Sequence, residues 1–146
     1  MDKVAYVCAA KHADAYCVTA SIDTVDFLAP VEVGELVSLL ASVNYVGNSS
    51  LVVGIKVISE NIKTHLVKHT NTSYFTMVAF DEQNKTVQVP GLILQDHTQV
   101  RRFYEAAHLK KMKKKFKEEG VFKEVINTTE TYLDLIKSER FIMLPV

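Results

Sequence analysis

The feature that most constrains the fold is a change of hydrophobic period near residue 16. Residues 3–12 are apolar on nearly all sides and contain strong helix formers, which predicts a helix buried on most of its surface. From residue 16 to about residue 80, apolar and polar residues alternate, as in half-buried strands. One buried helix followed by long consecutive strands predicts an α+β domain, with the helix packed on one face of an antiparallel sheet.

Turn residues divide the alternating region into a meander of about five strands. Turns are predicted at residues 47–50 and 81–85, a long fourth strand at 65–80, and a short fifth strand at 86–89, before Pro90. In the first two strands the predicted apolar faces contain Tyr16, Val18, Ala20 and Ile22, and then Val37, Leu39, Ala41, Val43 and Tyr45. Each face is expected to turn toward the core.

A helical period returns after Pro90-Gly91. Its apolar stripe is predicted to pack on protein and contains Phe103, Ala106 or Ala107, Leu109, Met112 and Phe116. A capping pattern at residues 127–130 predicts a further helix at Thr128–Glu139. The chain is therefore divided into a domain at 1–95 and a C-terminal helical extension at 96–146.

Composition and motifs exclude several classes of function. A chain of 146 residues suits one domain, and no stretch of 18 apolar residues predicts a membrane span. No secretory signal is found at the start, so we expect a cytoplasmic protein. Phosphate-loop, dinucleotide-binding and nucleophile-elbow motifs are absent from the sequence, and His65 and His69 stand too far apart to predict a metal pair. The two cysteines have no zinc spacing.

Several short fragments follow one another in the order and spacing of a known family. They are Met1-Asp2, Ala9–His12, Val18–Asp23, Phe27–Val31, Val33–Val37, Gly47–Ser50 and Thr72–Ala79, ending at Val89-Pro90. Over about residues 1–118 the sequence resembles the hot-dog fold acyl-CoA thioesterases. The resemblance implies a sheet wrapped around a central helix, and hydrolysis of fatty acyl-CoA to a free fatty acid and coenzyme A.

The resemblance also implies an assembly and a set of site residues. The site would form between two hot-dog units of a dimer or a trimer of dimers, with no cofactor, because coenzyme A belongs to the substrate. Asp2 would activate water as a general base or act as the nucleophile. Alternatively, Asp2 only stabilises the positive end of the helix.

The other implied site residues bind substrate. The turn Gly47-Asn48-Ser49-Ser50 would meet the coenzyme A pyrophosphate, or it is an ordinary hairpin turn. Thr72 and Ser73 would let the pantetheine arm approach the sheet, although packing explains them nearly as well.

Two expectations concern the ends of the resemblance. The family has a strand and a Gly-rich loop before the Met-Asp motif, so we expect the 1–95 hot-dog domain to be N-terminally truncated. The alternative function is then a non-catalytic acyl-CoA-binding or assembly module.

The six lysines between Lys110 and Lys117 would attract coenzyme A phosphates or form a solvated helix face. Nucleic-acid binding is not expected, because the cluster matches no recognition motif.

Overall fold

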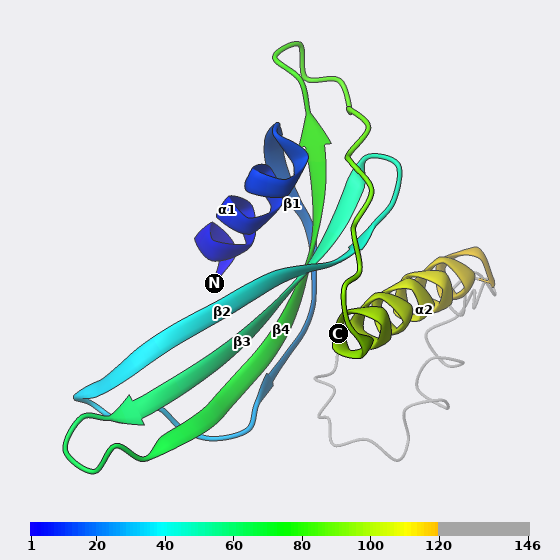
Figure 1. Ribbon diagram of the computed structural model, residues 1–146. Coiled ribbons are helices and arrows are strands. Elements are labelled where there is room, and N and C mark those ends of the chain that lie inside the picture. Colours follow the sequence, from blue (N-terminus) through cyan, green and yellow to red (C-terminus); the bar gives the residue numbers. More distant parts are fainter. Residues whose placement is uncertain (120–146) are drawn as a thin grey trace, which may run out of the picture. The chain divides into compact units, whose positions relative to one another are not determined.

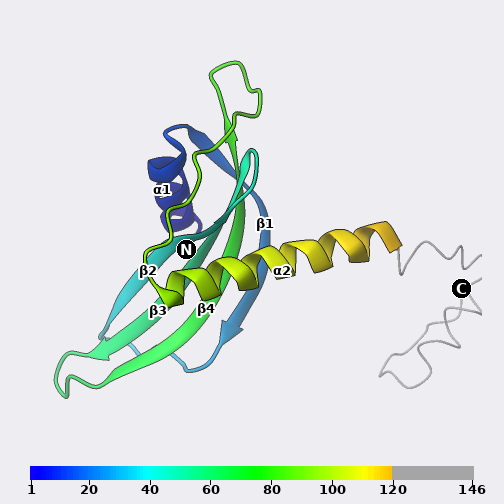
Figure 2. The ribbon, with the colours of Figure 1, turned by 45° about the vertical axis from the view of Figure 1, so that its right-hand side comes forward.

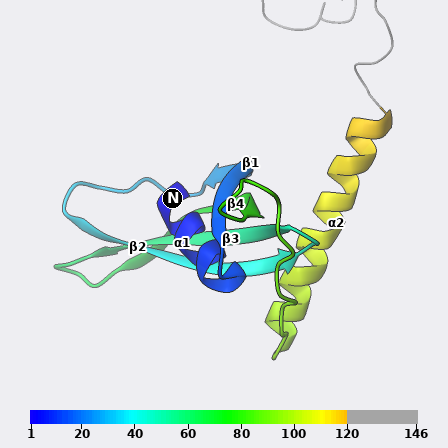
Figure 3. The same cartoon turned by 90° about the horizontal axis from the view of Figure 1, so that it is seen from above.

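The computed structural model describes residues 1–119, which form one antiparallel sheet and two helices (Figure 1). In chain order the elements are α1 (Asp2–Ala13), β1 (Tyr16–Phe27), β2 (Glu35–Val46), β3 (Ser50–Asn61), β4 (Val67–Phe80) and α2 (His97–Glu119). The strand order is β1-β4-β3-β2. Helix α1 lies against one face of the sheet (Figures 1 and 3), which confirms the predicted α+β class.

The predicted five-strand meander is wrong in two respects. Only β2, β3 and β4 form a meander, because β1 pairs with β4 rather than with β2. The predicted fifth strand is reduced to a single bridge between Phe80 and Thr86. Alternation identifies a strand but not its partner, since the partner depends on contacts between residues far apart in the sequence.

The predicted faces of β1 and of the end of β2 are wrong. In β2 the register skips Asn44, so Tyr45 pairs with Val52 and turns away from α1, while Val46 takes the core position beside Leu51. In β1 the buried residue is Cys17, and the predicted Tyr16 is 59% exposed. One inserted residue reverses every later side chain, which accounts for Tyr45. Tyr16 precedes the bulges of β1, and there the alternation alone did not show which of the two faces is buried.

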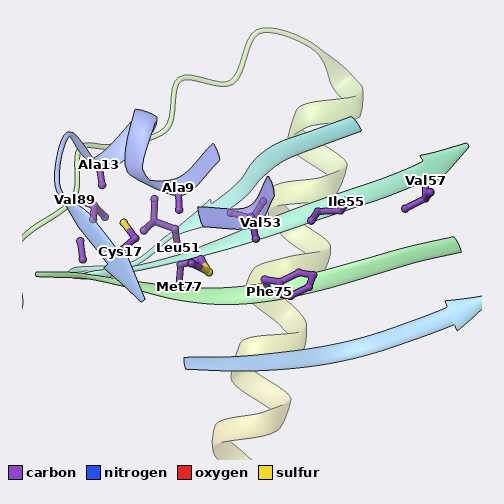
Figure 4. Close-up of a cluster of buried hydrophobic side chains, with 12 residues drawn as sticks. Ala9, Ala13, Cys17, Leu51, Val53, Ile55, Val57, Phe75, Met77 and Val89 are labelled. Atoms are coloured by element: carbon purple, nitrogen blue, oxygen red, sulfur yellow. The ribbon is translucent and has the colours of Figure 1, made fainter. Parts of the chain in front are cut away.

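The core lies between α1 and the sheet (Figure 4). Three alanines spaced four apart, Ala5, Ala9 and Ala13, form the buried side of α1, and their small size lets the helix approach the strands closely. The strands contribute larger side chains, including Leu51, Val53, Ile55, Phe75 and Met77. The prediction that α1 is buried on most sides is wrong, because Tyr6 and Val7 are exposed.

The chain divides into two compact units, with the boundary between Leu109 and Lys110 inside α2, which Figure 2 shows as one continuous helix. In the first unit Phe103 stacks on Tyr45 with ring centroids 5.1 Å apart, and Ala106 is buried. Both belong to the predicted stripe, whereas its other members Leu109, Met112 and Phe116 are exposed. The predicted helix Thr128–Glu139 lies outside the described residues, and the predicted boundary at 95/96 stays a prediction.

Within residues 1–119, neither helix combines the length and the apolar character that crossing a bilayer requires.

Candidate active site at the N-terminal end of α1

The first turn of α1 places a carboxylate above β1. Asp2 is the first helical residue, and its exposed side chain accepts a hydrogen bond of 2.7 Å from the Thr19 hydroxyl to Oδ1. Thr19 faces α1 because it pairs with the core residue Met77, whose sulfur lies 3.3 Å from the same hydroxyl. The interaction leaves Oδ2 of Asp2 without a partner among the described hydrogen bonds. Sequence reasoning missed Thr19, whose only signal was its place in the fragment Val18–Asp23.

Met1 connects this turn to β4. Its sulfur lies 3.1 Å from the hydroxyl of Ser73 and 3.5 Å from the side-chain nitrogen of Asn71. Ser73 is completely buried on the face of the sheet that carries α1. The structure therefore places the predicted residue Ser73 next to the Met-Asp motif.

An apolar groove of about 560 Å³ begins at Met1. Its walls come from the end of β1 and the segment after it, from β2 and β3, and from the bulge in β4. They comprise Phe27, Leu28, Ala29, Pro30, Val31, Val37, Leu39, Val57, Thr70 and Asn71. The segment is held in place because the backbone N–H groups of Leu28 and Ala29 both donate to the Thr70 carbonyl, at 2.7 and 3.3 Å. Asp2 thus follows directly on Met1, which lines this apolar groove.

The remaining predicted binding residues lie apart from this channel. Thr72 is on the opposite face of the sheet from Ser73, because neighbouring residues of a strand point to opposite sides. In the Gly47–Ser50 turn, the Ser49 carbonyl accepts from the N–H of Ala79, and the Asn48 carbonyl accepts from that of Val89. Figure 4 shows Val89 beside Ala13, so the turn lies toward the C-terminal end of α1. A role for these residues in binding stays a prediction.

The histidines singled out in the sequence have local partners. His12, in the last turn of α1, lies with Nε2 3.1 Å from the Pro90 carbonyl. The fourth strand begins at Val67 rather than at residue 65, so His65 precedes it and contacts Glu60 instead of sharing a face with His69. His69 lies with Nε2 2.8 Å from the Thr72 hydroxyl.

A partly buried ion pair joins the start of β2 to the start of β4. The Glu35 side chain, 5% exposed, lies 2.9 Å from the Lys68 ammonium and accepts a 2.9 Å hydrogen bond from the backbone N–H of Glu32. That N–H, followed by the Lys68 ammonium, lowers the pKa of Glu35 from its ordinary value. The pair ties the loop after β1 to β4.

Burial raises the pKa of the thiols of Cys8 and Cys17, so neither is an activated nucleophile.

The arrangement suits an acyl transfer to water. A carboxylate with one free oxygen can accept a proton from water. The first N–H groups of α1 have no acceptor inside the helix and point toward the same end, where the helix dipole favours negative charge. The groove accepts an apolar chain. A carboxylate, the N-terminal end of a helix and an apolar groove therefore lie at the same end of α1.

Comparison with known proteins identifies the family. The family model of the thioesterase superfamily matches residues 1–65. Protein VdlD of Helicobacter pylori is 46% identical over 126 residues, which cover 83% of this chain and 72% of that protein.

Two solved structures share the fold. A hexameric acyl-CoA thioesterase superposes with a TM-score of 0.76 at 36% identity, covering 82% of this chain and 76% of that one. The acyl-CoA hydrolase of Staphylococcus aureus, solved with butyryl coenzyme A and coenzyme A, superposes with a TM-score of 0.74 at 29% identity, covering 93% and 77%. The chain belongs to the hot-dog fold acyl-CoA thioesterase family, which confirms the resemblance found in the sequence.

Proposed function

We propose that this protein hydrolyses fatty acyl-CoA to a free fatty acid and coenzyme A, with Asp2 as the general base. The observation that carries the proposal is the Asp2–Thr19 hydrogen bond, made by the residue that follows Met1 in the lining of the apolar groove. The groove holds the acyl chain, and the thioester carbonyl lies beside the carboxylate.

In the reaction a water molecule attacks the thioester carbon while Oδ2 of Asp2 accepts its proton. The carbonyl oxygen becomes an oxyanion, which the first N–H groups of α1 stabilise. The C–S bond then breaks, the fatty acid is released, and the proton passes to the departing thiolate of coenzyme A. Thr19 orients the carboxylate through Oδ1. This scheme needs no metal ion or cofactor, so we expect turnover to be unchanged by a chelator.

A relative supports the pairing of these two residues. Alanine variants of the Staphylococcus aureus acyl-CoA hydrolase at an aspartate and at a threonine have been characterised structurally and biochemically. The two positions are 17 residues apart in that chain, which is also the separation of Asp2 and Thr19.

The proposed site is completed by a second copy of the chain. Both β1 and β2 are edge strands of the described sheet, and large apolar side chains next to the groove are exposed, among them Phe27 at 78% and Leu28 at 62%. Exposed apolar patches beside a strand edge favour association. We therefore propose a dimer or a trimer of dimers. The relative with a TM-score of 0.76 is a hexamer, which supports this assembly.

The proposal is tested by steady-state hydrolysis of acyl-CoA substrates of increasing chain length. Asp2→Asn keeps the shape of the side chain but removes the base, so kcat should fall by about 10²- to 10⁴-fold. Asp14→Asn, at the exposed C-cap of the same helix, is the matched control and should keep full activity. A loss below about tenfold in Asp2→Asn would remove it from the mechanism, and binding without turnover in the native chain would leave only a binding module.

Sedimentation velocity tests the shared site. Phe27→Ser should shift the protein toward monomer and lower turnover, because the exposed ring beside the groove is lost. Ile93→Ser removes a side chain that is equally exposed, at 81%, but lies outside the groove, and it should change neither property. A native chain that is a stable, active monomer at micromolar concentration would contradict the composite site.

A further inference from the structure

A second cavity lies on the face of the sheet opposite α1 and Asp2. It has a volume of about 480 Å³, within the range of small-molecule pockets. Its walls come from β2, β3 and β4 and from the first turns of α2, all within the unit Met1–Leu109. Because the sheet separates it from the α1 face, it is not part of the site proposed for hydrolysis on the same chain.

The lining of this cavity is cationic. Lys56, His69, Arg101 and Arg102 line it together with one acidic side chain, Glu105. Arg101 neutralises Glu105, with its Nη1 at 2.7 and 2.9 Å from the two carboxylate oxygens. Lys56 and Arg102 have no ion-pair partner among residues 1–119. Two positive charges therefore face the cavity uncompensated, which favours an anion.

The floor of the cavity presents neutral donors. The bulge in β2 turns Asn44 to this side, and its side chain is buried, with the residue only 6% exposed. The Ser42 hydroxyl donates to Oδ1 of Asn44 at 2.8 Å, which leaves the amide N–H₂ as the free donor. Gly54 makes room for this amide, because a Cβ at position 54 would collide with the Asn44 side-chain nitrogen and lie 3.3 Å from the Tyr74 ring. The hydroxyl of Thr72 lines the same cavity.

We propose that this cavity binds the phosphate group of a nucleotide-sized organic phosphate. Two uncompensated cations match a phosphate dianion, and the Arg102 guanidinium can bind two of its oxygens. The Asn44 amide and the Thr72 hydroxyl serve the remaining oxygens. The volume exceeds what one phosphate ion fills, and the Tyr74 ring offers an apolar surface to the rest of the molecule.

The phosphate has two sources, a free nucleotide or the nucleotide end of acyl-CoA; the second source rests on the proposed function. Isothermal calorimetry of the full chain with ADP, adenosine 3′,5′-bisphosphate and inorganic phosphate tests the shared chemistry. We expect the nucleotides to bind, and the double variant Lys56→Gln/Arg102→Gln to weaken binding by at least about tenfold, with a smaller salt dependence.

The matched control is Lys63→Gln/Lys85→Gln, which removes the same charge from exposed positions outside the cavity and should bind as the native chain does. Gly54→Ala should also weaken binding, because its Cβ displaces Asn44; a urea titration checks that this variant is folded. The proposal is overturned if no probe binds the native chain at millimolar concentration, or if the cavity and control variants lose affinity equally.

Kinetics separates the two sources. If the cavity receives acyl-CoA, the Lys56/Arg102 variant raises KM for acyl-CoA but not for the matching acyl-pantetheine, which lacks the nucleotide. If it receives a free nucleotide, calorimetric binding is lost while both KM values stay unchanged. Either result supports the phosphate site. Because calorimetry needs no turnover, an inactive native chain would contradict the proposed function without affecting this test.

Discussion

The two faces of the sheet use the same strands for opposite purposes. Toward α1, β3 and β4 present Leu51, Ile55, Phe75 and Met77, none more than 2% exposed, against the alanine side of the helix. Away from α1, the alternate residues of the same strands line a cationic cavity over Gly54. Because successive side chains of a strand alternate, one stretch of chain supplies both an apolar core and a polar cavity. Stability should therefore depend on one face more than on the other.

The largest expected difference is between the neighbours Phe75 and Tyr74. Phe75→Ala empties a site that is 2% exposed and should lower the free energy of unfolding by about 3–5 kcal/mol. Tyr74→Ala removes a half-buried ring at the cavity and should cost only about 1 kcal/mol. Urea titration measures both. Equal losses in the free energy of unfolding would show that side chains on both faces of the sheet contribute equally to stability.

A second pair of variants compares the hydroxyls of the two faces. Thr19→Val keeps the shape of the side chain but removes the hydrogen bond to Asp2, a bond to a charged group worth about 1.5–3 kcal/mol. If that energy acts in the transition state, kcat should fall by about 10- to 100-fold. Thr76→Val, on the opposite face, is the control and should keep nearly full activity. A loss of the same size in both variants would mean that Thr19 has no special role.

Filling the apolar groove should change chain-length preference. Ala29→Phe would occupy space that about two methylenes of a long acyl chain need, and each buried methylene contributes about 0.8 kcal/mol. KM for long-chain acyl-CoA should therefore rise by about tenfold, with little change for a two-carbon acyl group. Ala20→Phe, at an exposed position of β1, is the matched control. A uniform rise over all chain lengths would place the acyl chain elsewhere.

The smallest expected effect concerns pH and the Glu35–Lys68 pair. The pKa of Glu35 is lowered in the folded state, chiefly by the Glu32 N–H and then by Lys68, so its ionised form stabilises the fold. This stabilisation is complete above the ordinary pKa of 4.5 and is lost as pH falls through the lowered folded value. Thermal unfolding of native protein and Glu35→Gln should thus differ at pH 7 and converge below pH 4.5. A constant difference over that range would exclude the ion pair as the cause.

Much of the fold could be predicted because its signals are local. The alternation from residue 16, the turn at Gly47–Ser50 and the helix of residues 3–12 each reflect short-range geometry, and the order of family fragments identified the thioesterase class. The Met-Asp motif predicted a carboxylate at the positive end of the first helix, and Asp2 is the first residue of α1. Ser73 also lies beside that motif.

The failures involve long-range pairing. The sequence around Asn44 contains no signal that predicts a bulge. One skipped residue in the strand register places Tyr45 on the opposite face of the sheet and Asn44 beside Gly54. The partner of β1 could not be found from its own alternation, because β4 lies some fifty residues further along the chain. The groove could not be predicted either, since its lining comes from five stretches of the chain that are separate in the sequence.

By itself, then, the sequence determined the elements, the family and the carboxylate at the head of α1, because hydrophobic period, turn chemistry and motif order are properties of neighbouring residues. Only the tertiary structure decided that Thr19 forms a hydrogen bond with Asp2, and that Ser73 rather than Thr72 lies on the α1 face of the sheet. It also brought Lys56 and Arg102 together at one cavity. The physical reason is that strand register and bulges are set by packing between distant segments, and a shift of one residue exchanges the two faces.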